Sequence, residues 1–240
     1  MSEFSKGPLT LPEMVKIISL LENPPEAEGV RRALRFYEVP ARLHEEGFKW
    51  GLCEDIRKML KHFQNPQHPS EIEWMLQFVR NANALLEVGS SFGGTLAQMA
   101  SVMQRGSKIV SVDAALDETP KFLNPVASLK ETCRQIAALG ASVELFIGDS
   151  HSAQLIEKVS DYAPFDFAFI DGDHTYEGVK ADWENYGPMA SVVGFHDIGG
   201  GVPEVAQFWR ELKESGEFRT AERCVTGDGV FGIGVVFREE

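Results

Sequence analysis

Leu85-Leu86-Glu87-Val88-Gly89-Ser90-Ser91-Phe92-Gly93-Gly94 is the segment that carries the most structural information in this sequence. Its apolar run with a carboxylate, its glycine-rich turn and the helical pattern of residues 95–100 predict a buried parallel strand, a tight loop and a helix N-terminus. Open α/β sheets bind nucleotides at such a junction. Glycine is favoured in the turn because the turn requires a positive φ and because a Cβ would hold the backbone away from a ligand.

The turn matches neither of two common nucleotide-binding motifs. Ser91 stands where the dinucleotide fingerprint requires glycine, and Gly93-Gly94-Thr95 stands where a phosphate-binding loop requires Gly-Lys-Ser or Gly-Lys-Thr. An NAD-dependent oxidoreductase is therefore disfavoured. A glycine turn that only connects a strand to a helix stays open as an alternative.

A regular alternation of strands and helices surrounds this segment. We expect strands at residues 84–88, 108–112, 142–147, 165–170 and 192–195, and helices at 95–104, 125–139, 151–160, 177–186 and 203–215. Residues 218–225 and 230–237 flank Thr226-Gly227-Asp228-Gly229, which predicts an antiparallel hairpin. The pattern indicates an α/β, Rossmann-like fold with helices on both faces of a mainly parallel sheet.

Charge and cysteine content disfavour several classes of partner and compartment. The formal net charge of −13 would repel a phosphate backbone, and the densest basic group is only Arg31, Arg32 and Arg35, so we expect neither nucleic acid nor a membrane as partner. Three widely spaced cysteines without a Cys-x-x-Cys motif favour free thiols in a reducing compartment. Residues 1–30 resemble neither a secretory signal nor a spanning helix, and we expect a cytoplasmic protein.

The N-terminal part differs from the rest of the chain. Residues 1–69 have a helical pattern broken by prolines, and we interpret them as a helical extension or cap on a domain that spans residues 70–240. These helices are expected to cover an acceptor pocket or to mediate self-association, so a homo-oligomer stays open.

Polar side chains follow the expected strands at the edge where doubly wound sheets bind ligands: Glu87, Asp113, Asp149, Asp171, His196 and Asp197. Asp113 is placed to accept both hydroxyl hydrogens of a ribose, which implies a nucleoside ligand. Asp149 with Ser150 is placed to reach the adenine edge, and a cap for the following helix explains Asp149 equally well.

Four motifs resemble those of class I S-adenosylmethionine (SAM)-dependent methyltransferases: residues 87–93, Asp113, Gly148-Asp149-Ser150 and residues 169–176. Within that class, Asp171-Gly172-Asp173-His174-Thr175-Tyr176 followed by His196-Asp197 resembles metal-dependent O-methyltransferases related to macrolide-sugar methyltransferases and cephalosporin hydroxylase-like proteins. The resemblance covers residues 70–240. It implies a seven-stranded sheet whose last strand is antiparallel.

The resemblance also implies roles for individual residues. The SAM-binding set would be Glu87, Gly89, Ser90, Phe92, Gly93, Asp113, Asp149, Ser150 and Asp171. The metal ligands would be Asp171, His196 and Asp197, with His174 as general base. Related enzymes often carry Glu-Asp in place of His196-Asp197, so the ion is magnesium, or manganese, iron or zinc if the imidazole is a ligand. Two alternatives stay open: His196 points away from the metal, and His174 is a structural histidine.

The sequence thus predicts a SAM- and divalent-metal-dependent O-methyltransferase that acts on a small hydroxylated molecule, such as a sugar, a polyketide or a phenol. The alternative is a protein that binds SAM or a related nucleoside without transferring a methyl group. Gly199-Gly200-Gly201 indicates either a mobile loop or a close approach of substrate to the backbone, and a flexible loop without a role is equally compatible.

Overall fold

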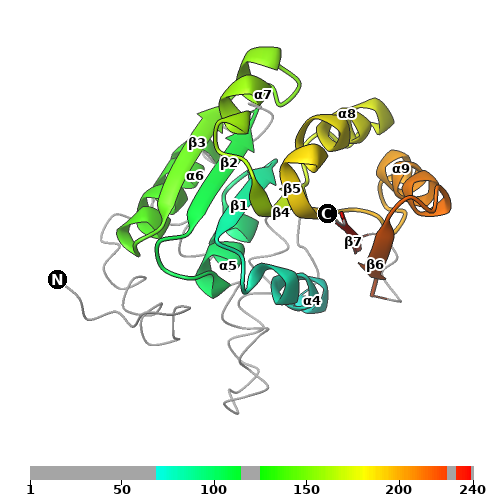
Figure 1. Ribbon diagram of the computed structural model, residues 1–240, viewed down its shortest axis with the longest axis horizontal. Helices are drawn as coiled ribbons and strands as arrows, with labels where there is room; N and C mark the ends of the chain where they lie inside the picture. Colours follow the sequence, from blue (N-terminus) through cyan, green and yellow to red (C-terminus); the bar gives the residue numbers. More distant parts are fainter. Residues whose placement is uncertain (1–68, 115–124, 226–230, 239–240) are drawn as a thin grey trace, which may run out of the picture.

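The computed structural model describes residues 69–114, 125–225 and 231–238, which form a seven-stranded sheet in the order β3-β2-β1-β4-β5-β7-β6 (Figure 1). The strands are β1 Ala84–Val88, β2 Lys108–Asp113, β3 Ser142–Ile147, β4 Phe165–Ile170, β5 Ala190–Phe195, β6 Arg219–Arg223 and β7 Ile233–Phe237. β1 to β5 are parallel, and β7 runs antiparallel between β5 and β6. The predicted Rossmann-like sheet with its antiparallel last strand is confirmed.

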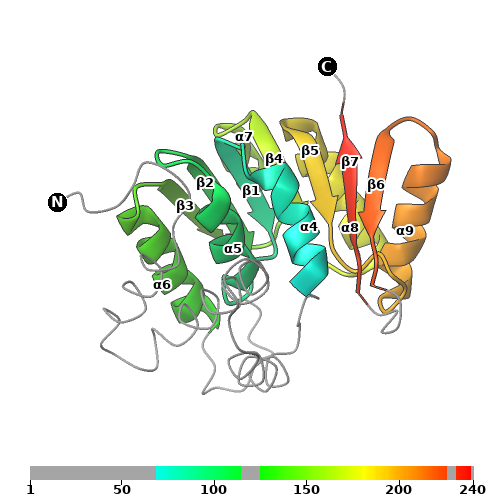
Figure 2. The same ribbon diagram turned by 90° about the horizontal axis from the view of Figure 1, so that it is seen from below.

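Helices cover both faces of the sheet (Figure 2). They are α4 Pro69–Val79, α5 Gly94–Val102, α6 Pro125–Ala138, α7 Ala153–Ser160, α8 Tyr176–Tyr186, the short 3-10 helix η1 Gly187–Met189 and α9 Pro203–Glu214. α4, α5 and α6 pack on one face, and α7, α8 and α9 pack on the other. None of the described helices is long and apolar enough to cross a bilayer.

The central strands are buried on both faces, as their near-continuous apolar sequences predict. In β1, Leu85 belongs to the core under α4, α5 and α6, whereas Leu86 and Val88 belong to the opposite core. The aromatic residues of α8 and α9 pack against this second core: Trp183, Tyr186, Phe208 and Trp209. Tyr186, Phe208 and Trp209 are buried and Trp183 is partly buried, so these rings contribute to packing.

The strand register brings the ends of four strands into line. Val88 pairs with Val112 on one side and with Ile170 on the other, and Ile170 pairs in turn with Phe195. The hydrogen-bond ladder continues past these residues, because the Asp171 N–H donates to the Val88 carbonyl at 2.8 Å and the His196 N–H donates to the Ile170 carbonyl at 3.2 Å. The polar residues that follow the strands are therefore held at one edge by the sheet itself.

Two sequence predictions fall largely outside the described residues. Of the predicted N-terminal extension at residues 1–69, only Pro69 is described, and it is the first residue of α4. The turn Thr226-Gly227-Asp228-Gly229 lies outside the described residues as well, although both flanking strands form the predicted antiparallel pair.

Candidate active site

The glycine turn after β1 follows a left-handed path at three residues: Gly89 with φ 87°, Ser91 with φ 49° and Gly93 with φ 85°. Ser91, which breaks the dinucleotide fingerprint, thus adopts a backbone conformation that favours glycine. A Cβ on Gly89 would lie 2.1 Å from the carbonyl oxygen of Asp171. Glycine is required at residue 89 because the turn packs directly against the loop that follows β4.

Asp113 holds the same turn from the side of β2. Its Oδ2 accepts hydrogen bonds from the backbone N–H groups of Ser90, at 3.0 Å, and Ser91, at 2.6 Å. The Ser90 hydroxyl lies 2.7 Å from the Ser111 hydroxyl in the buried interior. The residue predicted to bind a ribose therefore also fixes the turn, and that second task was not anticipated from the sequence.

Glu87 is a fully buried carboxylate at the end of β1. Neither of its carboxylate oxygens has a hydrogen bond of ordinary geometry. Burial raises its pKa well above the usual value, and the negative charges of Asp171 and Asp113 add to this effect. A buried polar group in this state needs an explanation, and a ligand that donates hydrogen bonds to it is one.

The loop after β3 carries Asp149 and Ser150, the residues predicted to lie at the adenine edge. Asp149 is exposed, and its Oδ1 accepts a hydrogen bond from the His151 N–H at 2.9 Å. The helix α7 begins only at Ala153 with Ser152 as its N-cap, so a capping role for Asp149 is not supported. The Ser150 carbonyl accepts a hydrogen bond from the Tyr186 hydroxyl at 2.6 Å.

Two carboxylates and two imidazoles meet at the ends of β4 and β5, and we call these four residues the acid–imidazole cluster: Asp171, His174, His196 and Asp197. The Nδ1 atom of His196 lies 3.2 Å from Oδ1 of Asp171 and 3.1 Å from Oδ1 of Asp197. The Nε2 atom of His174 lies 3.4 Å from a carboxylate oxygen of each aspartate. Asp197 takes up its position with φ 60°, a strained value for a residue with a Cβ.

The electrostatics of this cluster are those of mutually stabilised charges. Burial alone would raise the pKa of Asp171, but the positive charge of His196 and the nearby His174 outweigh burial and lower it to about 2. Burial alone would lower the pKa of His196, but the negative charge of Asp171 outweighs burial and raises this pKa to about 10. The hydrogen bond to Asp171 raises the pKa of His174.

The two histidines differ in exposure. The side chain of His196 is 1% exposed and lies between two aromatic rings, Phe169 at 6.4 Å and the stacked Phe231 at 6.0 Å. The side chain of His174 is 39% exposed. Only His174 is therefore positioned to touch a molecule that enters from solvent.

Within the described part of the chain, one group of residues has donor atoms that all lie within 4.8 Å of one another, as metal ligands require: Asp171, His174 and Asp197. This set contains His174, which we predicted as the base, and omits His196, which we predicted as a ligand. Both histidines nevertheless lie beside the two aspartates.

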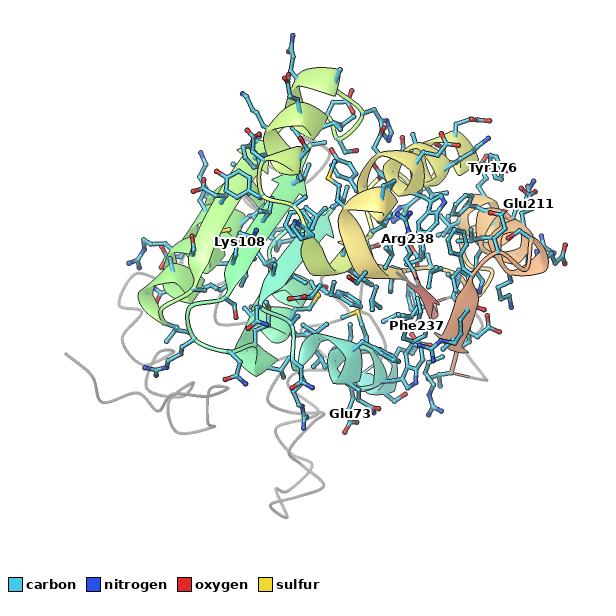
Figure 3. All side chains as sticks on the ribbon, viewed as in Figure 1. Glu73, Lys108, Tyr176, Glu211, Phe237 and Arg238 are labelled. Atoms are coloured by element: carbon cyan, nitrogen blue, oxygen red, sulfur yellow. The ribbon has the colours of Figure 1, made fainter. Side chains whose placement is uncertain are left out.

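The remaining residues of the motif after β4 have structural tasks. Oδ1 of Asp173 accepts from the Thr175 N–H at 2.9 Å, and Thr175 is the N-cap of α8, accepting from the Gly178 N–H at 3.0 Å. Tyr176 points toward α9, where its hydroxyl donates to Glu211 (Figure 3). Of the six residues from Asp171 to Tyr176, only Asp171 and His174 thus belong to the acid–imidazole cluster.

Sequence reasoning missed two features of the site. The first is Phe231, which stacks on His196 although it comes from the hairpin. A Cβ on Gly199 would lie 1.7 Å from the Phe231 carbonyl oxygen, so tight packing explains this glycine better than mobility or substrate approach. The second is the contact between the partly exposed His151 and the buried Asp182, which no motif predicted.

Comparison with known proteins gives the following matches. Residues 86–198 match the family model described as "Methyltransferase domain". No curated protein matches the chain in sequence.

The solved structures to which this chain is similar include two O-methyltransferases and a methyltransferase. An O-methyltransferase from Bacillus cereus in complex with SAH is 14% identical, with a TM-score of 0.56 over 82% of this chain and 94% of that chain. The O-methyltransferase TomG from Streptomyces achromogenes, involved in tomaymycin synthesis and solved with SAM, is 17% identical, with a TM-score of 0.52 over 99% of both chains. A methyltransferase from Geobacter sulfurreducens is 14% identical, with a TM-score of 0.50 over 97% of this chain and 98% of that chain. At these identities the likeness establishes the fold.

Proposed function

We propose that this chain, which carries a methyltransferase domain in residues 86–198 on the fold of known O-methyltransferases, transfers the methyl group of SAM to a hydroxyl oxygen of a small molecule with the help of a divalent cation. The observation that carries the proposal is the acid–imidazole cluster of Asp171, His174, His196 and Asp197, which lies directly beside the glycine turn. A cofactor bound along the turn would thus have its reactive end next to charged groups that can act on an acceptor hydroxyl.

The residues of the glycine turn and its neighbours suit a nucleoside that also carries an amino acid. Glu87 offers two buried carboxylate oxygens, neither with a hydrogen bond of ordinary geometry, which suits the ammonium group of the methionine part. Asp113 suits the ribose hydroxyls, and Asp149 with Ser150 suits the adenine edge. Gly89, Ser90, Phe92 and Gly93 would form the wall along which the methionine part lies, with Asp171 at its end.

The acid–imidazole cluster also fits a divalent cation. Oδ1 of Asp197 and Nδ1 of His196 are buried without a hydrogen bond of ordinary geometry, and two carboxylates plus an imidazole form a familiar donor set. We propose Asp171, Asp197 and His196 as the ligands, because His196 is too deeply buried to touch a substrate. When bound, the ion would lower the pKa of the acceptor hydroxyl and orient the acceptor oxygen.

His174 is the proposed general base. Its half-exposed imidazole is within reach of an acceptor, whereas its contacts with Asp171 and Asp197 orient the ring. In the reaction the acceptor oxygen attacks the sulfonium methyl carbon, the C–O bond forms as the C–S bond breaks, and the hydroxyl proton passes to His174. The products are the methyl ether and S-adenosylhomocysteine (SAH).

A second assignment of the histidines is favoured by one observation. The donor atoms of Asp171, His174 and Asp197 lie within 4.8 Å of one another, which suits His174 as a metal ligand. In that case His196 would be a buried cation that holds the two aspartates. Mn²⁺ titration of two variants separates the assignments: ours requires His196→Asn to lose Mn²⁺ affinity and His174→Gln to keep it, and the other requires the reverse.

The proposed function is tested by two measurements on the full chain. Calorimetry with SAH should give saturable binding that persists in EDTA, and Asp113→Ala should remove most of it. With SAM and a panel of hydroxylated sugars, polyketides and phenols, turnover should stop in EDTA and return with Mn²⁺ or Mg²⁺. Turnover that survives thorough chelation would remove the metal from the proposal. SAH binding without any methylated product across a broad panel would instead favour a protein that only binds SAM.

A further inference from the structure

A second buried contact between a histidine and an aspartate lies outside the acid–imidazole cluster. His151 is in the loop after β3, and Asp182 is in the middle of α8, on the second face of the sheet. Nε2 of His151 lies 3.3 Å from Oδ1 of Asp182. The carboxylate is completely buried, whereas the imidazole is 30% exposed.

Burying the carboxylate of Asp182 at this position costs folding free energy. Neither of its carboxylate oxygens has a hydrogen bond of ordinary geometry, and its only ion-pair neighbour among the described residues is the partly exposed imidazole of His151. Burial raises the pKa of Asp182 to about 6, although Ser150, His151 and the backbone of Asp173 act in the opposite direction. A carboxylate that is buried at such a cost is a better candidate for a functional role than for a stabilising one.

The position of Asp182 connects two loops of the proposed site. On one side, His151 belongs to the loop of Asp149 and Ser150, which we call the adenine-edge loop. The backbone of this loop is also held to α8 by the hydrogen bond from the Tyr186 hydroxyl to the Ser150 carbonyl. On the other side, a Cβ on Gly172 would lie 3.1 Å from Oδ2 of Asp182, so the carboxylate lies against the loop that starts with Asp171. Asp182 therefore touches both the adenine-edge loop and the base of the loop that carries His174.

We infer that His151 and Asp182 are positioning residues that hold the adenine-edge loop in the shape that binds the adenosyl end of SAM. The inference rests on the proposed function. Neither residue needs to touch the cofactor: His151 ties the loop to α8, and α8 is joined at its N-terminus to the loop of Asp171 and His174. Helix α8 would then support both the loop at the adenosyl end of SAM and the loop that carries Asp171 and His174.

The test compares SAH affinity with stability in Asp182→Asn. The amide has the shape of the carboxylate and no charge, so the melting temperature at pH 7.5 should stay the same or rise, while the Kd of SAH rises about tenfold because the loop loses its anchor. A residue with only a scaffold role would move stability and affinity in the same direction. His151→Gln, at a partly exposed position, should show the same loss, and the double variant should lose no more than either single variant.

Two controls make the result specific. Glu184→Gln removes a charge from the same helix at an exposed position, and it should leave the Kd of SAH within about twofold. 5′-Methylthioadenosine, which has the adenosyl end but no amino acid, should lose the same factor as SAH in Asp182→Asn. Glu87→Gln, by contrast, should weaken SAH and spare 5′-methylthioadenosine.

The outcomes separate this inference from the proposed function. If the unaltered protein does not bind SAH, the proposed function fails. If it binds SAH and the folded Asp182→Asn and His151→Gln variants bind it within about twofold of the unaltered protein, the inference is overturned and the proposed function stands. A loss of affinity that only follows a loss of stability would also overturn it. If Asp182→Asn does not fold, His151→Gln alone decides.

Discussion

Two contacts between a histidine and an aspartate have nearly equal lengths, but the pKa of the aspartate is shifted in opposite directions in the two. His196 lies 3.2 Å from Asp171 in the acid–imidazole cluster, and His151 lies 3.3 Å from Asp182 behind the adenine-edge loop. In the first contact the pKa of the aspartate is lowered to about 2, and in the second it is raised to about 6. Distance alone therefore does not determine how a buried carboxylate behaves.

The difference comes from the number and the burial of the imidazole groups beside each carboxylate. Asp171 is contacted by two imidazoles, one of them almost fully buried, so its charge is compensated in a medium where charge interactions are strong. Asp182 has one imidazole, which is partly exposed, and the interactions with Ser150 and with the Asp173 backbone do not outweigh its burial. We therefore assign the first contact to the proposed reactive site and the second to the proposed support of the adenine-edge loop.

The largest contrast is expected in turnover. Asp171→Asn removes a proposed metal ligand and the partner of both imidazoles, so kcat/KM for methyl transfer should fall by at least about 10³-fold. Asp182→Asn should act mainly through the affinity for SAM, with KM rising about tenfold and kcat falling less. Steady-state kinetics on the best acceptor of the panel measures both. Equal losses of kcat in the two variants would contradict the proposal that Asp171 takes part in the reaction and that Asp182 acts only through SAM binding.

The next largest effect concerns the two histidines that face solvent in part. His174→Gln should lower kcat by about 10²-fold to 10³-fold, because the acceptor loses its base, and should leave SAH affinity within about twofold. His151→Gln should do the reverse, weakening SAH and sparing kcat at saturating SAM. A His174→Gln variant with unchanged kcat would return this histidine to a structural role.

Stability should respond to pH with opposite signs at the two aspartates. Asp171 has a lowered pKa, so it contributes stability above its unfolded value of about 3.9 and loses that contribution as the pH falls toward 2. Asp182 has a raised pKa, so its contribution is fully present below about pH 3.9 and is lost as the pH rises through 6. Groups that face Asp182 include His151, Asp173 and Tyr186.

The corresponding measurement is urea unfolding of the two asparagine variants between pH 4 and pH 8. Relative to the unaltered protein, Asp182→Asn should be about neutral at pH 4 and stabilising by up to about 3 kcal/mol at pH 8. Asp171→Asn should be destabilising by about 3 kcal/mol near neutral pH, since it leaves the buried His196 with one carboxylate partner, Asp197, in place of two. Stability differences that do not change with pH would contradict the assigned charge states.

The smallest effect is expected from the aromatic cover of His196, which has no counterpart at His151 among the described residues. Phe231→Leu removes the stacked ring at 6.0 Å and should cost about 1 kcal/mol of folding free energy. The SAH affinity should not change, because Phe231 packs on His196 and beside Gly199, after β5, rather than at the adenine-edge loop. Thermal unfolding with and without SAH checks both statements.

The sheet could be predicted from the sequence because local sequence patterns identify its strands and helices. Residues 84–88, 142–147 and 165–170 read as apolar strands between turn signals, and the structure has strands at those positions. Pro203 begins α9 as its position suggested. The register then follows from parallel pairing, so the alignment of Asp113, Asp171 and His196 at one edge was also accessible.

The sequence did not predict the contacts between distant segments. Phe231 reaches His196 because β7 inserts beside β5, a topological fact that local periodicity does not encode. The burial of Asp182 depends on which face of α8 packs on the sheet, and in the sequence this residue looks like any solvated acid between Ala181 and Trp183. The role of Asp113 in holding the glycine turn was hidden because its partners are backbone N–H groups, which carry no sequence signal.

The most direct test of the account is a crystal structure of the full chain with SAH and Mn²⁺, with anomalous data collected at the manganese edge. We predict one anomalous peak at about 2.0–2.3 Å from carboxylate oxygens of Asp171 and Asp197 and from a ring nitrogen of His196, with SAH along the glycine turn. SAH bound in the turn without a peak between the two aspartates would contradict the proposed metal site.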